Sequence, residues 1–259
     1  MLLQQAIAYI SRKRTRNLVL FLILLLILSC LYFCFSLMQV GGRLEEHIKQ
    51  SAGTSFALTS KQGDKPFSLK EAEKVQQLAG VGSMVPQYES PVRILGKEAV
   101  TGQQSVERDD LGQEAKQALG AVFTQKTDQH LDFRSGSFQL VQGKHLSDKA
   151  RGQILIHQEL AKKNKLKVGD SLTLSSFQMG ETPAKEQTFK IVGIFSGKKQ
   201  EKFTGMTSDL SENQVYLPYE DATKLLGLSQ QEVTQVTFGV KDPEKIDALL
   251  KQVKSLNLD

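Results

Sequence analysis

The strongest constraint on this chain is an unbroken apolar segment near its N-terminus. Leu18 to Met38 contains no charged residue and only two polar ones, Ser29 and Ser36. As a helix that rises 1.5 Å per residue it would be about 31 Å long, enough to span the core of a bilayer. A secretory signal has a shorter apolar region of roughly 7 to 15 residues, and a buried core helix is not apolar on every side. The segment is therefore predicted to be a transmembrane helix.

Basic residues crowd one end of this segment. Arg12, Lys13, Arg14 and Arg16 lie immediately before it, whereas the residues after it form a nearly neutral mixture. Because positive charge is retained in the cytoplasm, the N-terminus is predicted to be cytoplasmic and the chain after about residue 39 extracellular. These four cations supply most of the formal net charge of +5, and no basic stripe interleaved with aromatic residues follows. The charge therefore reports topology, and we expect no nucleic-acid partner.

The first two parts of the chain follow from these patterns. Within residues 1–16, four apolar residues recur at helical spacing: Leu3, Ala6, Ile7 and Ile10. They predict a cytoplasmic amphipathic helix on the inner leaflet, with a frayed terminus as the alternative because isolated short helices are marginal in water. Residues 17–39 form the predicted transmembrane helix in the lipid bilayer. Its Cys30 and Cys34 are interpreted as packing residues.

The region beyond the membrane combines helices and strands. It contains no cysteine, so a hydrophobic core must hold it together without disulfides. Residues 54–95 read as one strand, helix, strand unit, in which Ser68 and Glu71 form a capping box and the glycines of "GVG" end the helix. Pro91 in the second strand suggests a sheet edge or a bulge.

A second strand and helix lie at the C-terminal end. The strand covers residues 232–240, and the helix begins with Asp242 as its cap and Pro243 at its first position. Its apolar stripe is predicted to be buried and comprises Ile246, Leu249, Leu250, Val253 and Leu256. We expect strand 232–240 to pair beside residues 54–60 or 88–95.

These patterns predict an α+β fold with a split domain organisation. Residues 40–95 and 232–259 would form a discontinuous, extracellular βαβ-type core, incomplete at its C-terminus, so we expect the chain to be a fragment that ends inside a domain. Residues 96–231 would form an inserted, mostly β subdomain with five strand signals and two small helices, around 158–164 and over 220–226. The segment 197–213 has the composition of a mobile, exposed loop.

No signature of catalysis survives inspection. The segment "GIFSGKK" over 193–199 resembles a phosphate loop, but it lacks one residue between the glycines and has Lys199 where a serine or threonine is needed. The histidines, at 47, 130, 145 and 157, lack metal-ligand spacing and are interpreted as solvated surface residues. Asp109 and Asp110 lie in a polar stretch and are interpreted as solvated. We therefore expect no enzyme activity, no cofactor and no metal site in this chain.

Several segments resemble the extracytoplasmic core domain of MacB-like and FtsX-like ABC transporter permeases. The resemblance lies in "QILIHQELAKKNKLKVGDSLTLSS", "EQTFKIVGIFSG" and "NQVYLPYEDATKLLGL", and within the family it is greatest to streptococcal Vex-type peptide exporters. Three matching positions have structural reasons: Gly169 and Asp170 make a turn into a strand, and Gly193 lets a packed strand pass close to its neighbour. In "FQLVQGKHLSD" the match is partial, because Lys144 replaces the usual arginine.

The resemblance implies a role in transport. A permease of this family has four membrane helices, pairs with an identical or paralogous permease, and is driven by a separate cytoplasmic ATPase. By resemblance, the split core is porter-like and the insertion sabre-like. The exported substrate is a peptide, an antimicrobial-type compound or another small molecule, and the location is the plasma membrane of a Gram-positive bacterium. Only the first membrane helix of this plan is present. The alternative hypothesis is a single-pass surface receptor, adhesin or assembly scaffold.

Overall fold

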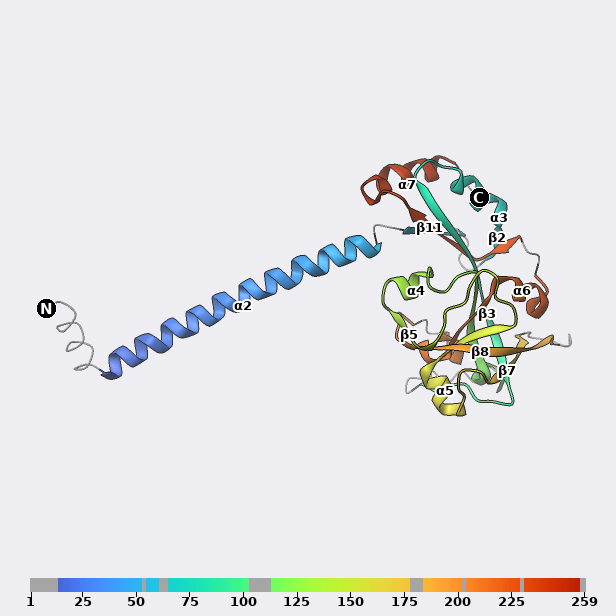
Figure 1. Ribbon diagram of the computed structural model, residues 1–259, viewed down its shortest axis with the longest axis horizontal. Coiled ribbons are helices and arrows are strands. Elements are labelled where there is room, and N and C mark those ends of the chain that lie inside the picture. The colour runs from blue at the N-terminus through green and yellow to red at the C-terminus, as the bar shows by residue number, and fades with distance from the viewer. Residues whose placement is uncertain are drawn as a thin grey trace. The chain divides into compact units, whose positions relative to one another are not determined.

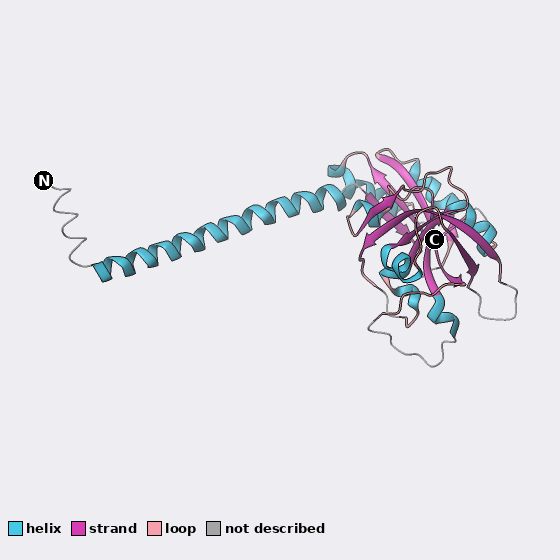
Figure 2. Ribbon diagram, turned by 60° about the horizontal axis from the view of Figure 1, so that its bottom comes forward, coloured by secondary structure: helices cyan, strands magenta, loops and turns pink. Residues whose placement is uncertain are grey.

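The computed structural model describes residues 14–52, 55–60, 65–102, 113–177, 184–201, 204–228 and 231–256. The chain divides into two compact units, residues 1–50 and residues 51–259. The described part of the first unit is helical, and that of the second is a mixed domain of strands and helices. Figures 1 and 2 show the elements of each. The predicted amphipathic helix over residues 1–16 lies almost wholly outside the described residues.

One helix, α2 (Arg14–Ala52), passes through the predicted membrane segment and continues beyond it. Its leucine-rich sequence contains no proline, and the backbone stays helical through the glycine pair at 41 and 42. A helix of 39 residues extends for about 58 Å at 1.5 Å per residue, nearly twice the thickness of a bilayer core. The predicted transmembrane helix ended at residue 39, but the helix continues through this position to Ala52.

A nine-stranded sheet organises the domain, in the order β1-β11-β3-β4-β9-β6-β8-β5, with β7 paired to β3 and β8. Its strands are β1 (Ser55–Thr59), β3 (Val81–Leu95), β4 (Ala118–Thr124), β5 (Phe138–Gly143), β6 (Gln153–His157), β7 (Ser171–Ser176), β8 (Glu186–Gly197), β9 (Gln214–Pro218) and β11 (Gln235–Val240). The short strands β2 (Phe67–Ser68) and β10 (Glu232–Val233) form a separate antiparallel pair.

The described residues of the domain contain five α-helices: α3 (Leu69–Gln76), α4 (Leu131–Arg134), α5 (Gln158–Asn164), α6 (Tyr219–Leu226) and α7 (Ile246–Ser255). Four short 3-10 helices complete the described elements: η1 (Gln113–Gln117), η2 (Thr207–Asp209), η3 (Ser211–Asn213) and η4 (Pro243–Lys245). Both small helices predicted inside the insertion, α5 and α6, are confirmed, and the single turn α4 was not foreseen.

The two ends of the domain meet in the sheet as predicted. β11 pairs antiparallel with β1, from Ser55 opposite Gly239 to Thr59 opposite Gln235. On its other side, β11 pairs antiparallel with β3 through Gln87. In a simple βαβ unit the two parallel strands are direct neighbours. Here β11 lies between β1 and β3, so the expected unit is interrupted by a third strand. We call the strands β1, β11 and β3 with the helices α3 and α7 the split unit.

Helices α3 and α7 contribute to the main hydrophobic core together with alternate residues of the split unit. Val236 and Phe238 of β11 are fully buried beside Ala72 and Val75 of α3. The stripe of α7 is buried less than predicted: Leu249 is 4% exposed, three members are partly exposed, and Leu256 is 36% exposed. Asp242 accepts a hydrogen bond from the Glu244 amide at the start of η4, so the predicted cap opens a 3-10 turn ahead of α7.

The strand β3 joins the two predicted parts of the domain. It starts at Val81, inside the "GVG" that was expected only to end the preceding helix, and continues for 15 residues. Its first half pairs with β11 and its second half with β4 and β7, and Pro91 lies between the β11 and β7 registers. The sheet and the main core are continuous across the proposed boundaries at 95 and 231, so the two-part division stays a prediction.

The segment after β8 is more ordered than the sequence suggested. Its described part contains η2 and η3, and Ser211 and Asn213 are fully buried. The Asn213 side-chain amide donates to the carbonyl oxygens of Val100 and Thr207, each at 2.7 Å. The prediction of an exposed segment is therefore wrong for Ser211 and Asn213, because the buried Asn213 amide supplies hydrogen bonds that regular structure lacks, and the mobility of the segment stays a prediction.

Candidate functional site

A second, smaller cluster of aromatic side chains lies at the opposite end of the sheet from β1. Phe138 of β5, Phe195 of β8 and Tyr216 of β9 are buried, and Phe133 of α4 packs against them. The centroids of the Phe138 and Phe195 rings are 4.9 Å apart, and those of Phe133 and Tyr216 are 5.1 Å apart. These tilted and edge-to-face geometries are the favourable ones for aromatic pairs.

Three histidines surround this cluster, two of which are buried. His130 and His157 are each 4% exposed, and their rings contact Tyr216 and Phe195, respectively. The prediction that they are solvated surface residues is wrong. His145 is partly exposed and lies edge-on to Phe133. The side chain of His47 lies outside the described side chains.

Both buried histidines cap helices. In each, Nδ1 accepts a hydrogen bond at 3.2 Å from the amide two residues later, that of Asp132 at the start of α4 and that of Glu159 at the start of α5. Because Nδ1 accepts, Nε2 carries the proton in the neutral ring, and in His157 it donates to the Gly197 carbonyl oxygen at 3.1 Å. Burial lowers the pKa of His157 and lowers that of His130 to about 4.

A polar network closes one side of the aromatic cluster. The Tyr216 hydroxyl donates to Oδ2 of Asp132 at 2.6 Å, and Nζ of Lys199 lies 3.5 Å from the same oxygen. Burial, followed by the Asp132 charge, raises the pKa of Tyr216 well above its ordinary value. The phenol therefore stays protonated as a donor, which makes this network a structural tie between α4, β9 and the end of β8.

The residues Gly169 and Asp170 form the turn between α5 and β7. Gly169 has a φ of 102°, a conformation that side chains rarely adopt, and its amide donates to the Ile191 carbonyl oxygen at 2.8 Å. The Asp170 carboxylate accepts from the Lys167 amide at 2.8 Å, which closes the turn. The local geometry thus accounts for both residue types, and their role in function stays a prediction.

Gly193 lies where β8 crosses the segment after β5. A Cβ atom at this position would lie 2.7 Å from the Lys144 carbonyl oxygen and 3.3 Å from Cγ of Leu155. Only glycine fits such an approach without displacing backbone. Lys144 itself donates its amide to the Val192 carbonyl oxygen at 3.0 Å, so the partly matching family segment is bonded directly to β8.

Two of the four residues predicted to set the topology lie at the start of α2. Arg14 and Arg16 fall within the first turn, whereas Arg12 and Lys13 lie outside the described residues. From Leu18 to Ser36 the helix is long and apolar enough to cross a membrane, and none of that window is buried within the protein. Met38 continues the same helix, with its side chain outside the described ones.

Within the described ranges, no group of three or more His, Cys, Asp or Glu side chains is placed to hold a metal ion. The buried polar groups of the aromatic cluster serve as caps and donors. A sequence signal for the buried histidines did exist, since His-x-Asp at 130–132 and His-x-Glu at 157–159 place an acceptor at a helix start with an acid in the first turn.

Comparison with known proteins identifies related chains. The permease YclI of Bacillus subtilis (strain 168), described as an uncharacterized ABC transporter permease, is 28% identical over 135 residues, which are 49% of this chain and 27% of YclI. The chain therefore matches only about a quarter of the length of that relative.

Two solved structures are similar to this chain at low identity. The extracellular domain of YknZ, a noncanonic ABC-type transporter from Gram-positive bacteria, is 13% identical with a TM-score of 0.47, covering 78% of this chain and 90% of that one. The periplasmic region of MacB from Actinobacillus actinomycetemcomitans is 13% identical with a TM-score of 0.48, covering 82% of this chain and 89% of that one.

The family model gives the broadest match. The model of the MacB-like periplasmic core domain aligns with residues 20–256, from inside the apolar helix to the end of α7. That alignment covers most of α2, every described strand and every described helix of the domain. The chain therefore belongs to the family of MacB-like periplasmic core domains.

Proposed function

We propose that this chain is the N-terminal part of a permease subunit of an ABC-type exporter. The observation that carries the proposal is the family match over residues 20–256, a single alignment that includes most of the apolar helix and the whole described domain. In this proposal α2 passes through the plasma membrane with its basic end in the cytoplasm, and the domain lies outside. A separate cytoplasmic subunit hydrolyses ATP, and a second permease completes the transporter.

The structure supports a mechanical role for α2. It is a continuous helix of 39 residues, and its backbone hydrogen bonds run without a break from the predicted cytoplasmic edge to Ala52. A single helix can carry a displacement along its axis farther than a hinged segment could, since every peptide unit is bonded to the next turn. We propose that this displacement moves the outer domain during each cycle of ATP hydrolysis, and that the substrate is a peptide, as in the Vex-type exporters of Gram-positive bacteria.

The test is the recovery of partners from the native membrane. A chromosomally tagged protein, solubilised in mild detergent, should co-purify with an ATPase that carries a Walker loop and with a second permease. In this proposal the apolar face of the predicted amphipathic helix over residues 1–16 contacts the ATPase. Replacement of Ile7 and Ile10 by Asp should reduce ATPase recovery by about tenfold or more, because each substitution would bury a charge in that contact.

A matched control replaces Gln4 and Gln5, on the other side of the same predicted helix, by Asp and should leave the yield of ATPase unchanged. Recovery of the tagged protein without any ATPase would contradict the transporter proposal. It would favour instead a single-pass receptor, adhesin or scaffold, whose partners would be extracellular.

A further inference from the structure

A cavity of about 240 Å³ lies on the face of the split unit opposite to α3 and α7. It is lined by Ser83 and Val85 of β3, Thr237 and Gly239 of β11, and Gln129 and Arg134 from the segment that contains α4. Successive strand residues point to opposite faces. Because Val236 and Phe238 belong to the core with α7, Thr237 and Gly239 face the cavity.

The cavity exists because the residues on this face of the sheet are small. Gly239 lies directly opposite Ser83 in the register of β11 and β3, and a Cβ atom at 239 would collide with the Ser83 hydroxyl. Glycine at this position therefore leaves the hydroxyl free to occupy the cavity. The backbone at Gly239 does not have a positive φ, so its conformation does not require glycine. The structural reason for glycine at this position is the close approach of the Ser83 hydroxyl.

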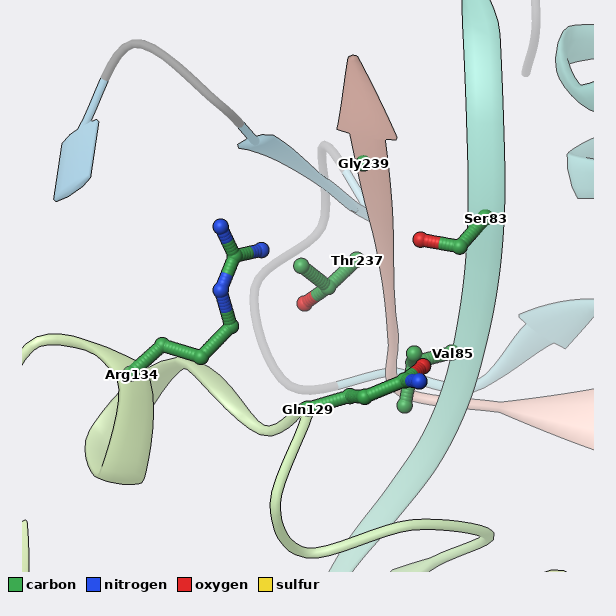
Figure 3. Close-up of a pocket in the computed structure, with 6 residues that line it drawn as sticks. All are labelled: Ser83, Val85, Gln129, Arg134, Thr237 and Gly239. Carbon is green, nitrogen blue, oxygen red and sulfur yellow. The ribbon is translucent and has the colours of Figure 1, made fainter. Parts of the chain in front are cut away.

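The polar groups around the cavity converge from two sides. Figure 3 shows the Arg134 and Gln129 side chains on the segment that contains α4, and the hydroxyls of Ser83 and Thr237 on the two strands. Thr237 is 4% exposed, and its Oγ1 is buried without a hydrogen-bond partner among the described residues. A buried hydroxyl without a partner costs free energy, and a bound group that bonds to it would recover that cost.

The charge of the lining selects the kind of group that fits. None of the described lining residues is acidic, and one, Arg134, is a cation with an exposed side chain. A guanidinium pairs best with a planar carboxylate, through two parallel hydrogen bonds. Hydroxyl and amide groups can donate to the same oxygens. A metal ion would find no carboxylate, imidazole or thiolate here, and an apolar ligand would find only Val85.

We propose that this cavity binds the carboxylate group of a small ligand, with Arg134 supplying the charge and the Ser83 and Thr237 hydroxyls the orientation. The volume equals that of roughly eight water molecules at about 30 Å³ each, which is below the 300 to 1,000 Å³ of pockets for drug-sized molecules. The cavity therefore admits a carboxylate with a few neighbouring atoms. A peptide C-terminus and the side chain of an aspartate present the same chemistry.

The two sources are separated by a titration of the full chain in detergent micelles, followed by amide chemical shifts in NMR. The probes are trialanine, trialanine amide, N-acetyl-aspartyl amide and N-acetyl-asparaginyl amide. Trialanine alone should shift the amides of Ser83, Thr237 and Gly239 if the site takes peptide C-termini. N-acetyl-aspartyl amide should do so if it takes acidic side chains. Equal shifts from the neutral amides, or none from either carboxylate, would overturn the proposal.

Variants assign the binding to the cavity. Arg134→Gln should weaken carboxylate binding by about tenfold or more, since it removes the charge and keeps a donor of similar shape. Thr237→Val, which keeps the volume, should weaken binding about fivefold, the effect of one hydrogen bond. Gly239→Ala should abolish binding, because its methyl group would collide with the Ser83 hydroxyl and displace it from its place in the cavity.

The control is Lys251→Gln, which removes one positive charge from α7 on the opposite face and should leave the affinity unchanged. The spectra themselves report whether each variant is folded. Unchanged binding in both Arg134→Gln and Gly239→Ala would show that the carboxylate binds elsewhere and would overturn the proposal. Neither the partner ATPase nor transport is needed for these measurements, so their outcome is independent of the proposed exporter function.

Discussion

His130 couples the packing of α4 to pH. Its ring is buried against Tyr216, its Nδ1 accepts from the Asp132 amide, and its Nε2 has no hydrogen-bond partner among the described residues. Burial lowers its pKa from 6.5 to about 4, while nearby Asp132 acts in the opposite direction and Lys199 reinforces the effect. A protonated ring would lose its role as a cap, because both nitrogens would then be donors.

This environment predicts a loss of stability in acid. As the pH falls, the unfolded chain takes up the proton near pH 6.5, whereas the folded protein takes it up only near pH 4. The contribution of His130 to the free energy of unfolding is therefore complete above about pH 6.5. It falls by up to about 3 kcal/mol as the pH drops to about 4. Urea unfolding of the full chain, followed by tyrosine fluorescence, measures the free energy of unfolding at each pH.

The matched variant is His130→Asn, which keeps an acceptor at the helix start and does not titrate. Its free energy of unfolding should decrease less than that of the wild type between pH 7 and pH 4.5. Other groups titrate in both proteins, so the difference between the two curves isolates His130. If the free energy of unfolding decreased equally with falling pH in the wild type and the variant, the titration of His130 would not be a cause of the loss of stability in acid.

Gly193 offers a second prediction at the residue scale. Gly193→Ala would place a methyl group 2.7 Å from the Lys144 carbonyl oxygen and should lower the free energy of unfolding by about 1 to 3 kcal/mol. Gly82→Ala in β3 is the control, because its methyl group would meet nothing closer than 3.4 Å. We expect it to change stability by less than about 0.5 kcal/mol in the same urea experiment. Equal effects of the two substitutions would refute the steric reason.

Residue-scale inference from sequence succeeded for local geometry and failed for burial. The turn at Gly169 and Asp170 depends on neighbours in the chain, so its residue types are readable from the sequence. The burial of His130 and His157 depends on β5, β8 and β9, which come from distant segments. The cavity-lining set is equally remote, since Ser83, Arg134 and Thr237 belong to three separate parts of the chain.

At the scale of elements, the pairing of β1 with β11 is the feature most open to test. Thr59 and Gln235 lie opposite each other in the register, and opposite residues in an antiparallel pair have Cα atoms about 4.5 to 5.5 Å apart, within the range of a disulfide. Thr59→Cys with Gln235→Cys, in a chain without Cys30 and Cys34, should form a disulfide under mild oxidation.

The control pair is Ala57→Cys with Gln235→Cys, which is two residues out of register. Its Cα atoms are about 7 to 8 Å apart, too far for an unstrained disulfide, so it should oxidise much more slowly. Peptide mapping by mass spectrometry without reduction identifies the linked peptides. Equal rates of oxidation in both pairs would show that β1 does not hold this register.

Elements were predicted where their sequence pattern was strong. The strands "QILI", "FKIVGIF" and "NQVYLPY" are rich in β-branched and aromatic residues and were all identified. β4 was missed because "ALGAVFT" contains alanine and glycine, which favour strands weakly, yet it is an interior strand between β3 and β9. Its burial on both faces, and not its intrinsic preference, makes it a strand.

At the scale of the whole molecule, the sequence was sufficient for the order of parts: an apolar helix followed by a mixed domain with its two ends joined in one sheet. It was insufficient for the continuity of that sheet through the insertion, because β3 serves both parts along its length. Long strands that change partners leave no periodic signal at the change. The family match covers most of the apolar helix and the domain in one alignment, and so associates the two independently of their hydrophobic patterns.

The proposed topology gives the last prediction. Four cations precede the apolar segment, and the positive-inside rule places them in the cytoplasm. In a chain without its native cysteines, Ser147→Cys on the domain should react with a membrane-impermeant maleimide in intact spheroplasts, since Ser147 is exposed. Gln5→Cys, before the cations, should react only after lysis. Replacement of Arg12, Lys13, Arg14 and Arg16 by Gln should reduce the labelled fraction at position 147, because no charge would then fix the orientation. Labelling of Gln5→Cys in intact spheroplasts would place the domain inside the cell and would contradict the proposed topology.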